Sequence, residues 1–244
     1  MIEHHLDIET VDGSMNTFVT HPQSGGPHPV VLFLMDAPGK REELHDMARR
    51  ISACGYYVML PNLYYRQTRG FVLHREDPAS AEQMSAHMAS LTNAMVGQDV
   101  GVLLAHATDD PAADPSRVGV TGYCMSGPFA LWAAAEFPQA VHCAATVHGV
   151  RLAVDTDDSP HLRAGEIDGE VLVLAAEHDN WVDRPHYDRL VAALDGAGVT
   201  STCEWIDGVH HGFVFPERPL FDKPAAERHW ELLLDMFART LHDQ

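Results

Sequence analysis

Short apolar segments rich in β-branched residues alternate along this chain with longer amphipathic segments. Apolar runs of this length predict strands, and the longer stretches between them predict helices. Regular alternation of the two is typical of βα units that build a mainly parallel sheet flanked by helices, so the pattern predicts an α/β fold. The predicted strands are residues 29–34, 56–60, 118–121, 141–147, 171–176 and 201–206. The predicted helices are residues 41–54, 79–107, 126–137, 184–197 and 224–241.

The start of the chain departs from this alternation. Residues 6–10 and 15–20 flank an Asp12-Gly13 pair, which predicts an N-terminal antiparallel hairpin at a sheet edge. Residues 64–77 and 151–168 fit neither pattern and are predicted to be loops. Neither loop resembles a domain linker, because strand and helix signals resume on both sides. We therefore expect residues 1–244 to form a single domain.

The charge of the chain excludes several kinds of partner. Asp and Glu number 35 against 16 Lys and Arg, which leaves a formal net charge of -19. Such a surface repels nucleic-acid phosphates and anionic lipid heads, so we expect no nucleic acid and no membrane as partner. The first ten residues, MIEHHLDIET, lack the basic and apolar regions of a signal peptide. These features predict a cytoplasmic protein, either a monomer or a small homo-oligomer.

The four cysteines do not form a metal or redox motif. Cys54, Cys124, Cys143 and Cys203 are widely spaced and contain no C-x-x-C pair. Three of them lie in apolar segments and are expected to be small buried thiols, whereas Cys124 has a different context. The 17 histidines form no H-E-x-x-H motif. We expect no metal site and no cofactor.

Cys124 lies where a strand is predicted to turn sharply into a helix. The predicted strand 118–121 runs into segment 122–127, GYCMSG, and an apolar helical stretch follows. This pattern is typical of a nucleophile elbow, in which small residues must flank the nucleophile. The turn also places the sulfur at the positive end of a helix, which favours the thiolate. Cys124 is therefore the candidate nucleophile.

A cysteine nucleophile needs a base, and the base needs a carboxylate to orient it. Asp179 follows the apolar run VLVLAA, and His210 and His211 follow the last predicted strand. The order nucleophile, acid, histidine is that of the α/β-hydrolase fold. Taken separately, an Asp after a strand is often a helix cap and a loop histidine is usually solvated. Their shared order and position at strand ends favour a triad.

The three segments that carry these residues resemble the catalytic motifs of the dienelactone hydrolase family. These are GYCMSG, AAEHDNWV and HHGF, and the resemblance extends over most of the chain, including PNLYYRQ and segment 35–39. It implies an α/β-hydrolase fold and an ester or lactone hydrolase that acts on a small molecule. It also implies that the catalytic histidine is the one before Gly-Phe, which is His211.

Residues 36 and 37, in the turn after the first predicted parallel strand, are expected to assist the nucleophile. We expect the backbone N–H groups of Met125 and Ala37 to hold the oxyanion, since Pro38 has no N–H. The family usually has a Glu, thought to hold the resting nucleophile, where this chain has Asp36. Asp36 is shorter, so it either modulates the nucleophile or only braces its own turn.

The sulfur nucleophile predicts the class of substrate. A thiolate adduct expels stabilised leaving groups best, which favours enol lactones, aryl esters and thioesters. The aromatic residues adjoining the motifs are expected to line an apolar pocket, although core packing explains any one of them equally well. They are Tyr64, Tyr123, Trp181 and Phe213.

The resemblance also implies two arginines that grip the carboxylate of a dienelactone, and this chain departs at both places. No Arg or Lys occurs in residues 76–115, and apolar residues 213–215 follow the histidine. Arg69, Arg75 or Arg218 would have to substitute from a shifted position. We therefore expect neutral, apolar esters or lactones rather than carboxylated dienelactones. A ligand-binding protein and a redox sensor that uses Cys124 are the competing interpretations.

Overall fold

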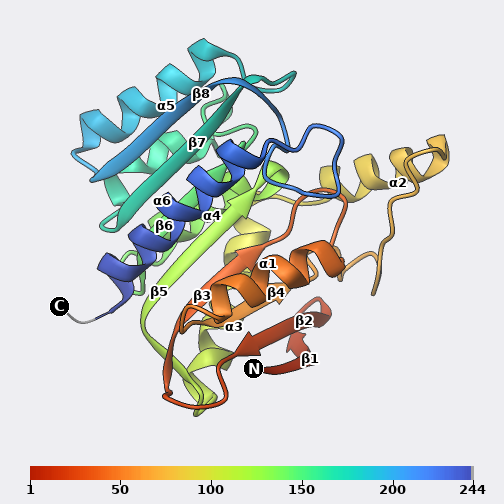
Figure 1. Ribbon diagram of the computed structural model, residues 1–244, viewed down its shortest axis with the longest axis vertical. Coiled ribbons are helices and arrows are strands. Elements are labelled where there is room, and N and C mark those ends of the chain that lie inside the picture. The colour runs from red at the N-terminus through yellow and green to blue at the C-terminus, as the bar shows by residue number, and fades with distance from the viewer. Residues whose placement is uncertain (243–244) are drawn as a thin grey trace. The chain divides into compact units, whose positions relative to one another are not determined.

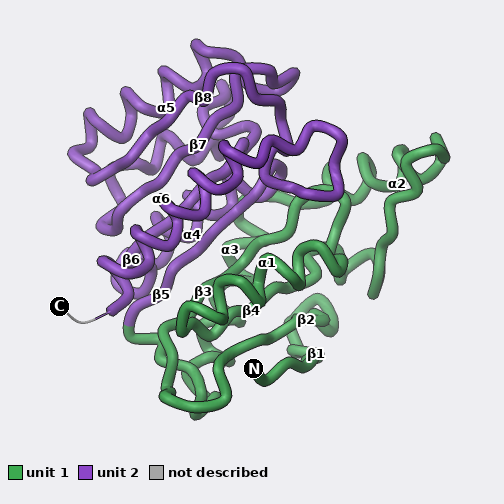
Figure 2. The backbone as a smooth tube through the Cα atoms, in the orientation of Figure 1, with its two compact units in different colours: residues 1–116 green, residues 117–244 purple. Residues whose placement is uncertain are grey.

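The computed structural model describes residues 1–242 and divides into two compact units, residues 1–116 and 117–244 (Figure 2). Figure 1 shows the strands and helices of each unit with their labels. The single-domain prediction is not tested by this division and stays a prediction.

Unit 1 contains a hairpin and two further strands. β1 (Ile2–Thr10) pairs antiparallel with β2 (Gly13–His21), β2 pairs antiparallel with β4 (Tyr57–Pro61), and β4 pairs parallel with β3 (His28–Leu34). The order is β1-β2-β4-β3, so the hairpin strand β1 lies at an edge. The predicted hairpin and its turn at Asp12-Gly13 are confirmed.

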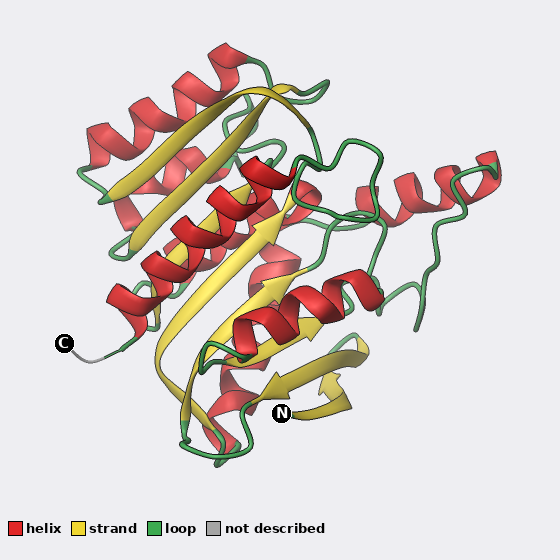
Figure 3. Cartoon of the chain, in the orientation of Figure 1, coloured by secondary structure: helices red, strands yellow, loops and turns green. Residues whose placement is uncertain are grey.

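Three helices accompany these strands. α1 (Glu42–Ser52) packs on β2 and β4, and α3 (Asn93–Asp109) contacts β1. α2 (Pro78–Ala89) buries only Ser80 and projects away from the strands of its unit (Figure 3). The prediction of one helix over residues 79–107 is wrong, because Thr92 interrupts it. The Thr92 side chain accepts a hydrogen bond from the Met95 backbone N–H and so caps the start of a separate helix, α3.

Unit 2 contains four parallel strands in sequential order. They are β5 (Ala113–Tyr123), which begins at the unit boundary, β6 (Val141–Val147), β7 (Glu170–His178) and β8 (Ser201–His210). Each pairs with the next along the chain. Val120, Ala144 and Val173 are almost fully buried, as expected for strands covered on both faces. The predicted strands are confirmed, with β5, β7 and β8 longer than expected.

Helices cover the strands of unit 2. α6 (Lys223–Leu241) packs on β6 and β7, α4 (Gly127–Glu136) packs on β6, and α5 (Arg184–Ala197) contacts β8 (Figure 1). The predicted loop 64–77 is confirmed, whereas loop 151–168 contains the short 3-10 helix η2 (Pro160–Glu166). No described helix has the length and apolar character needed to cross a membrane.

The parallel arrangement of unit 2 brings four strand ends together. β5, β6, β7 and β8 end at Tyr123, Val147, His178 and His210. The carboxyl ends of neighbouring parallel strands lie at one edge of the sheet, where α/β proteins place their ligand sites. The residues that follow these ends are Cys124, His148, Asp179 and His211.

Candidate active site

Cys124 occupies a strained turn between β5 and α4. Its backbone φ is 53°, a value that is uncommon for a residue with a side chain, and it begins the 3-10 turn η1 (Cys124–Ser126). A Cβ on Gly122 would lie 2.1 Å from the Ser126 carbonyl oxygen. A Cβ on Gly127 would lie 2.6 Å from Cα of Gly149. Backbone contacts therefore require the two glycines, Gly122 and Gly127, that were predicted beside the nucleophile.

Asp179 and His211 form a hydrogen-bonded pair. Nδ1 of His211 and Oδ2 of Asp179 are 2.7 Å apart, and the side chains are only 7% and 1% exposed. The other carboxylate oxygen accepts a hydrogen bond of 2.9 Å from the Trp181 backbone N–H. Asp179 is not a helix cap, because Asp183 caps α5. His210 is exposed and contacts His178, so the structure pairs His211 with the carboxylate.

The environment of His211 favours its protonated form. Burial lowers the pKa of His211, but the hydrogen bond to Asp179 and the nearby Cys124 thiol outweigh burial and raise this pKa to about 9. Nε2 of His211 is buried and forms no hydrogen bond of ordinary geometry within residues 1–242. Cys124 thus acts on the imidazole at close range without an aligned hydrogen bond. Cys124 and Nε2 of His211 are therefore neighbours and not hydrogen-bonded partners.

Two rings contact the imidazole of His211. The ring centroid of Trp181 is 4.7 Å away with the planes at 62°, and that of His148 is 4.6 Å away with the planes at 58°. Trp181 is 64% exposed, whereas His148 is 1% exposed. His148 is not among the residues predicted for the site. The sequence contains a signal for this position, because His148 directly follows the predicted strand 141–147 and so lies at the same sheet edge as the other motif residues.

The comparisons with known proteins show which family the chain belongs to. Residues 15–241 match the Dienelactone hydrolase family. This chain belongs to the dienelactone hydrolase family.

The chain is also similar to individual proteins. A protein of Methylorubrum extorquens is 28% identical over 243 residues, covering 97% of this chain and 81% of its own length. The carboxymethylenebutenolidase of Rhodococcus opacus is 28% identical over 228 residues, covering 88% of this chain and 83% of its own length. A crystal structure from Klebsiella pneumoniae shares the fold, with a TM-score of 0.86, 23% identity and coverage of 98% of both chains. The chain is accordingly a hydrolase of the α/β-hydrolase superfamily.

The remaining aromatic residues predicted for the pocket of this dienelactone hydrolase-like protein are buried. Tyr123 and Phe213 are fully buried, and both rings contact His148. The Tyr123 hydroxyl is 2.9 Å from Nε2 of His229 on α6. In unit 1, the hydroxyl of Tyr64 donates to the Ala37 carbonyl at 2.8 Å. Trp181 is the exposed member of the predicted set, and the pocket role of all four stays a prediction.

The turn that carries the predicted Asp36 and Ala37 is tightly braced within unit 1. Asp36 is fully buried, and its carboxylate accepts hydrogen bonds from both terminal nitrogens of Arg41, at 2.5 and 3.3 Å. Gly39 closes the turn by donating its N–H to the Asp36 carbonyl. Asp36 therefore has a charged partner in its own unit. In unit 2, Met125 is buried in η1.

The other cysteines differ partly from expectation. Cys143 is buried and Cys203 is partly buried, but Cys54 is exposed, so the prediction of a buried thiol is wrong there. Cys54 lies just beyond the end of α1, where the chain turns at the surface. Within residues 1–242, no group of three or more His, Cys, Asp or Glu side chains could hold a metal ion.

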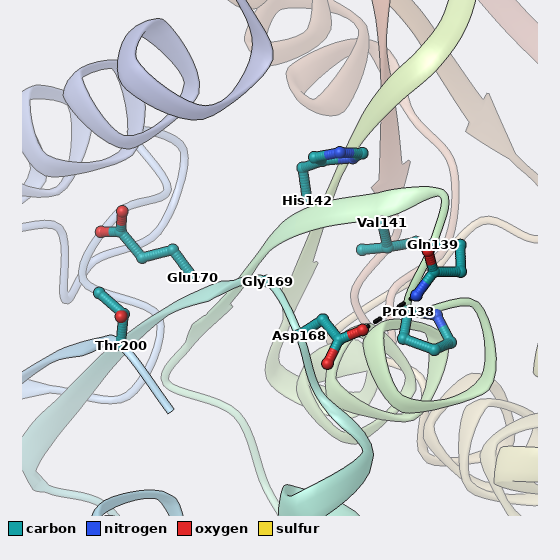
Figure 4. A pocket seen from close by; sticks show the side chains of 8 residues that line it. All are labelled: Pro138, Gln139, Val141, His142, Asp168, Gly169, Glu170 and Thr200. Carbon is teal, nitrogen blue, oxygen red and sulfur yellow. Dashed lines mark hydrogen bonds between the residues drawn. The ribbon is translucent and has the colours of Figure 1, made fainter. Parts of the chain in front are cut away.

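One cavity of unit 2, of about 420 Å³, lies at the opposite ends of the strands (Figure 4). It is lined by Pro138, Gln139, Val141, His142, Asp168, Gly169, Glu170 and Thr200. These residues precede or begin β6, β7 and β8, whereas Cys124 and His211 follow strand ends. The cavity is therefore separate from the predicted site.

Proposed function

We propose that this protein hydrolyses a carboxylic ester or lactone through a triad of Cys124, His211 and Asp179. The observation that carries the proposal is the 2.7 Å hydrogen bond between buried Asp179 and His211, at the sheet edge where Cys124 occupies a strained turn. A cysteine activated by a histidine that a carboxylate orients is the arrangement of a covalent acyl-transfer enzyme.

In the first half of the reaction, Cys124 forms a bond to the substrate. Its thiolate sulfur attacks the carbonyl carbon, and the carbonyl electron pair moves to oxygen. The tetrahedral intermediate collapses, the bond to the leaving oxygen breaks, and His211 gives that oxygen its proton. The product is a thioester between the acyl group and Cys124. The raised pKa of His211, about 9, keeps this proton available at neutral pH.

In the second half, His211 acts as a base. It takes a proton from water, the resulting oxygen attacks the thioester carbon, and the Cys124 sulfur leaves as thiolate. Asp179 holds the imidazole by Nδ1, which leaves Nε2 for both transfers. We assign oxyanion stabilisation to the backbone N–H groups of Met125 and Ala37.

Asp36 has an ion pair that argues for a mainly structural role. Its carboxylate is neutralised by Arg41, whose second partner is Glu43. We retain modulation of Cys124 by Asp36 as a secondary proposal. To reach Cys124, the Asp36 side chain would have to break its ion pair with Arg41.

The proposed substrates are neutral and have good leaving groups. A thiolate is expelled more readily than an ordinary alkoxide, so an enol lactone, an aryl ester or a thioester avoids reversal of the first step. Arg69 is exposed and paired with Asp7, and Arg75 is exposed. Arg218 lies 4.5 Å above the Phe215 ring and packs against Gly212, directly after His211. Arg218 is therefore the arginine to test as a carboxylate partner.

The nucleophile assignment is tested with 4-nitrophenyl acetate. Cys124→Ala removes the attacking sulfur, so turnover should fall to the background rate while the circular dichroism spectrum is unchanged. Cys54→Ala is the matched control, because Cys54 is an exposed free thiol, and it should retain full turnover. Undiminished hydrolysis by Cys124→Ala would contradict the assignment of Cys124 as the nucleophile. Rapid alkylation of Cys124 without any turnover would favour a binding protein or redox sensor instead.

A further inference from the structure

His148 shares the structural position of the three proposed triad residues. It directly follows β6, as Cys124 follows β5, Asp179 follows β7 and His211 follows β8. The four strands are consecutive neighbours in the sheet order of unit 2. Four adjacent parallel strands thus each present one chemically active residue at the same edge, and the proposed function uses three of them.

The burial of His148 carries a cost that packing alone does not explain. The residue is 1% exposed, and both of its ring nitrogens are buried without a hydrogen-bond partner within the described chain. Its backbone φ of 39° is also unusual for a residue with a bulky side chain. A phenyl ring would fill similar space without burying two unsatisfied polar atoms. Buried unsatisfied groups and strained backbone both occur preferentially at functional sites.

The surroundings of His148 keep it neutral. Burial lowers the pKa of His148 well below its usual value, and the charges of His211, Arg218 and His229 lower it further. These groups come from the loops after β8 and from α6. The remaining ring contacts are uncharged and come from Tyr123, Phe213 and Phe215. His148 therefore stays an imidazole when the neighbouring His211 becomes an imidazolium.

We propose that His148 is a positioning residue for His211, a neutral and polar ring that stabilises the His211 imidazolium and thereby the thiolate of Cys124. This inference rests on the proposed function. The ring centroids of His148 and His211 are 4.6 Å apart. The His211 ring is buried, and Asp179 holds it by a hydrogen bond at Nδ1.

The ring nitrogens are suited to this role because neither forms a hydrogen bond of ordinary geometry within residues 1–242, so no such bond fixes the tautomer. Either nitrogen of a neutral imidazole carries the proton, and the other presents a lone pair. With neither nitrogen held by a hydrogen bond from the described part of the chain, the tautomer that turns a lone pair toward positive charge is available. A dipole acts strongly in a buried site, where the effective dielectric constant is low. A phenyl ring has the shape of His148 but lacks this dipole.

Three variants separate the polar role from packing. His148→Phe keeps a ring and removes the nitrogens. His148→Asn keeps polar atoms and suits a positive φ, since Asn adopts that region more readily than most residues. His142→Phe is the matched control, because it makes the same change at the start of the same strand, beside the cavity in Figure 4.

The first measurement is alkylation of Cys124 by iodoacetamide across pH, followed by mass spectrometry. A less stable imidazolium leaves the proton on sulfur, so His148→Phe should alkylate roughly tenfold more slowly at pH 7 and approach the profile of an ordinary thiol. The second measurement is hydrolysis of 4-nitrophenyl acetate, for which kcat should fall roughly 10- to 100-fold with little change in KM. His148→Asn should recover part of both losses, and His142→Phe should match the unchanged protein.

The outcomes distinguish this inference from the proposed function. Equal alkylation profiles and kcat for His148→Phe and His142→Phe would overturn the role of His148. If His148→Phe does not fold, His148→Asn decides: an alkylation profile and a kcat between those of the unchanged protein and of an ordinary thiol support the polar role, whereas values identical to the unchanged protein, or a profile like that of an ordinary thiol, contradict it. Turnover that survives in Cys124→Ala would defeat the proposed function, while the alkylation comparison would still decide on His148. A Cys124 that is unreactive at every pH in the unchanged protein would contradict both.

Discussion

At the scale of single residues, the Asp179 and His211 pair couples the protonation of His211 to the stability of the fold. The pKa of His211 is about 9 in the folded protein, against 6.5 for an unperturbed histidine. A group whose pKa is raised on folding binds its proton more tightly in the folded state. Its contribution to stability is fully present below pH 6.5 and is lost as the pH rises through 9. The upper limit of this contribution is on the order of 3 kcal/mol.

Asp179→Asn should therefore destabilise the protein in a pH-dependent way. The amide cannot stabilise the imidazolium as the carboxylate does, so the free energy of unfolding should fall most at pH 6 and progressively less toward pH 9. Urea denaturation at a series of pH values measures this difference. Asp188→Asn changes an exposed carboxylate on α5 and should show no such trend above pH 6. A constant difference between Asp179→Asn and the unchanged protein would contradict the linkage.

At the scale of elements, the turn from β5 into α4 is held by backbone contacts. The hydrogen of Gly122 faces the Ser126 carbonyl, where a Cβ would be 2.1 Å from the oxygen. Atoms at this separation cannot remain in place, and the nearest atom is backbone rather than a flexible side chain. The geometry of Cys124 therefore depends on a residue two positions before it.

Gly122→Ala should force the turn open. We expect the free energy of unfolding to fall by roughly 1–3 kcal/mol, as for other overpacked sites, and alkylation of Cys124 at pH 7 to slow. Gly196→Ala provides the contrast, because Gly196 lies in α5 with no atom near the added Cβ. That change should stabilise the protein by about 0.5–1 kcal/mol. Normal stability and alkylation in Gly122→Ala would show that the turn tolerates a side chain.

At the scale of the whole molecule, charge acts on the choice of substrate. The net charge of -19 repels anions over distances set by the ionic strength. A carboxylated substrate also needs a cationic partner, and a bidentate arginine contact is worth roughly 1.5–3 kcal/mol. Both effects favour a neutral substrate.

The matched pair 4-nitrophenyl butyrate and 4-nitrophenyl hemisuccinate measures this preference. We expect kcat/KM to favour the butyrate by more than roughly tenfold, and the gap to narrow as salt screens the repulsion. Arg218→Gln should leave the ratio unchanged. A ratio that favours the hemisuccinate and is reversed in Arg218→Gln would show that Arg218 binds the carboxylate, and would return the proposal to carboxylated dienelactones.

The sequence by itself determined the α/β fold and the order of the motif residues. The glycines around Cys124 indicate a tight turn, and the alternation of apolar and amphipathic segments indicates strands and helices. Both signals are local, so they can be recognised in the sequence without knowledge of tertiary contacts. The antiparallel hairpin at Asp12-Gly13 follows from the same local rules.

Only the tertiary structure decided which side chains meet. It gave Asp36 the partner Arg41 and placed His148 against His211. The break of the long predicted helix at Thr92 has a local cause, because the Thr92 side chain caps the start of α3 through the Met95 N–H. The contact between His148 and His211 joins residues 63 positions apart, and such a contact is a property of the packed molecule that no local pattern records.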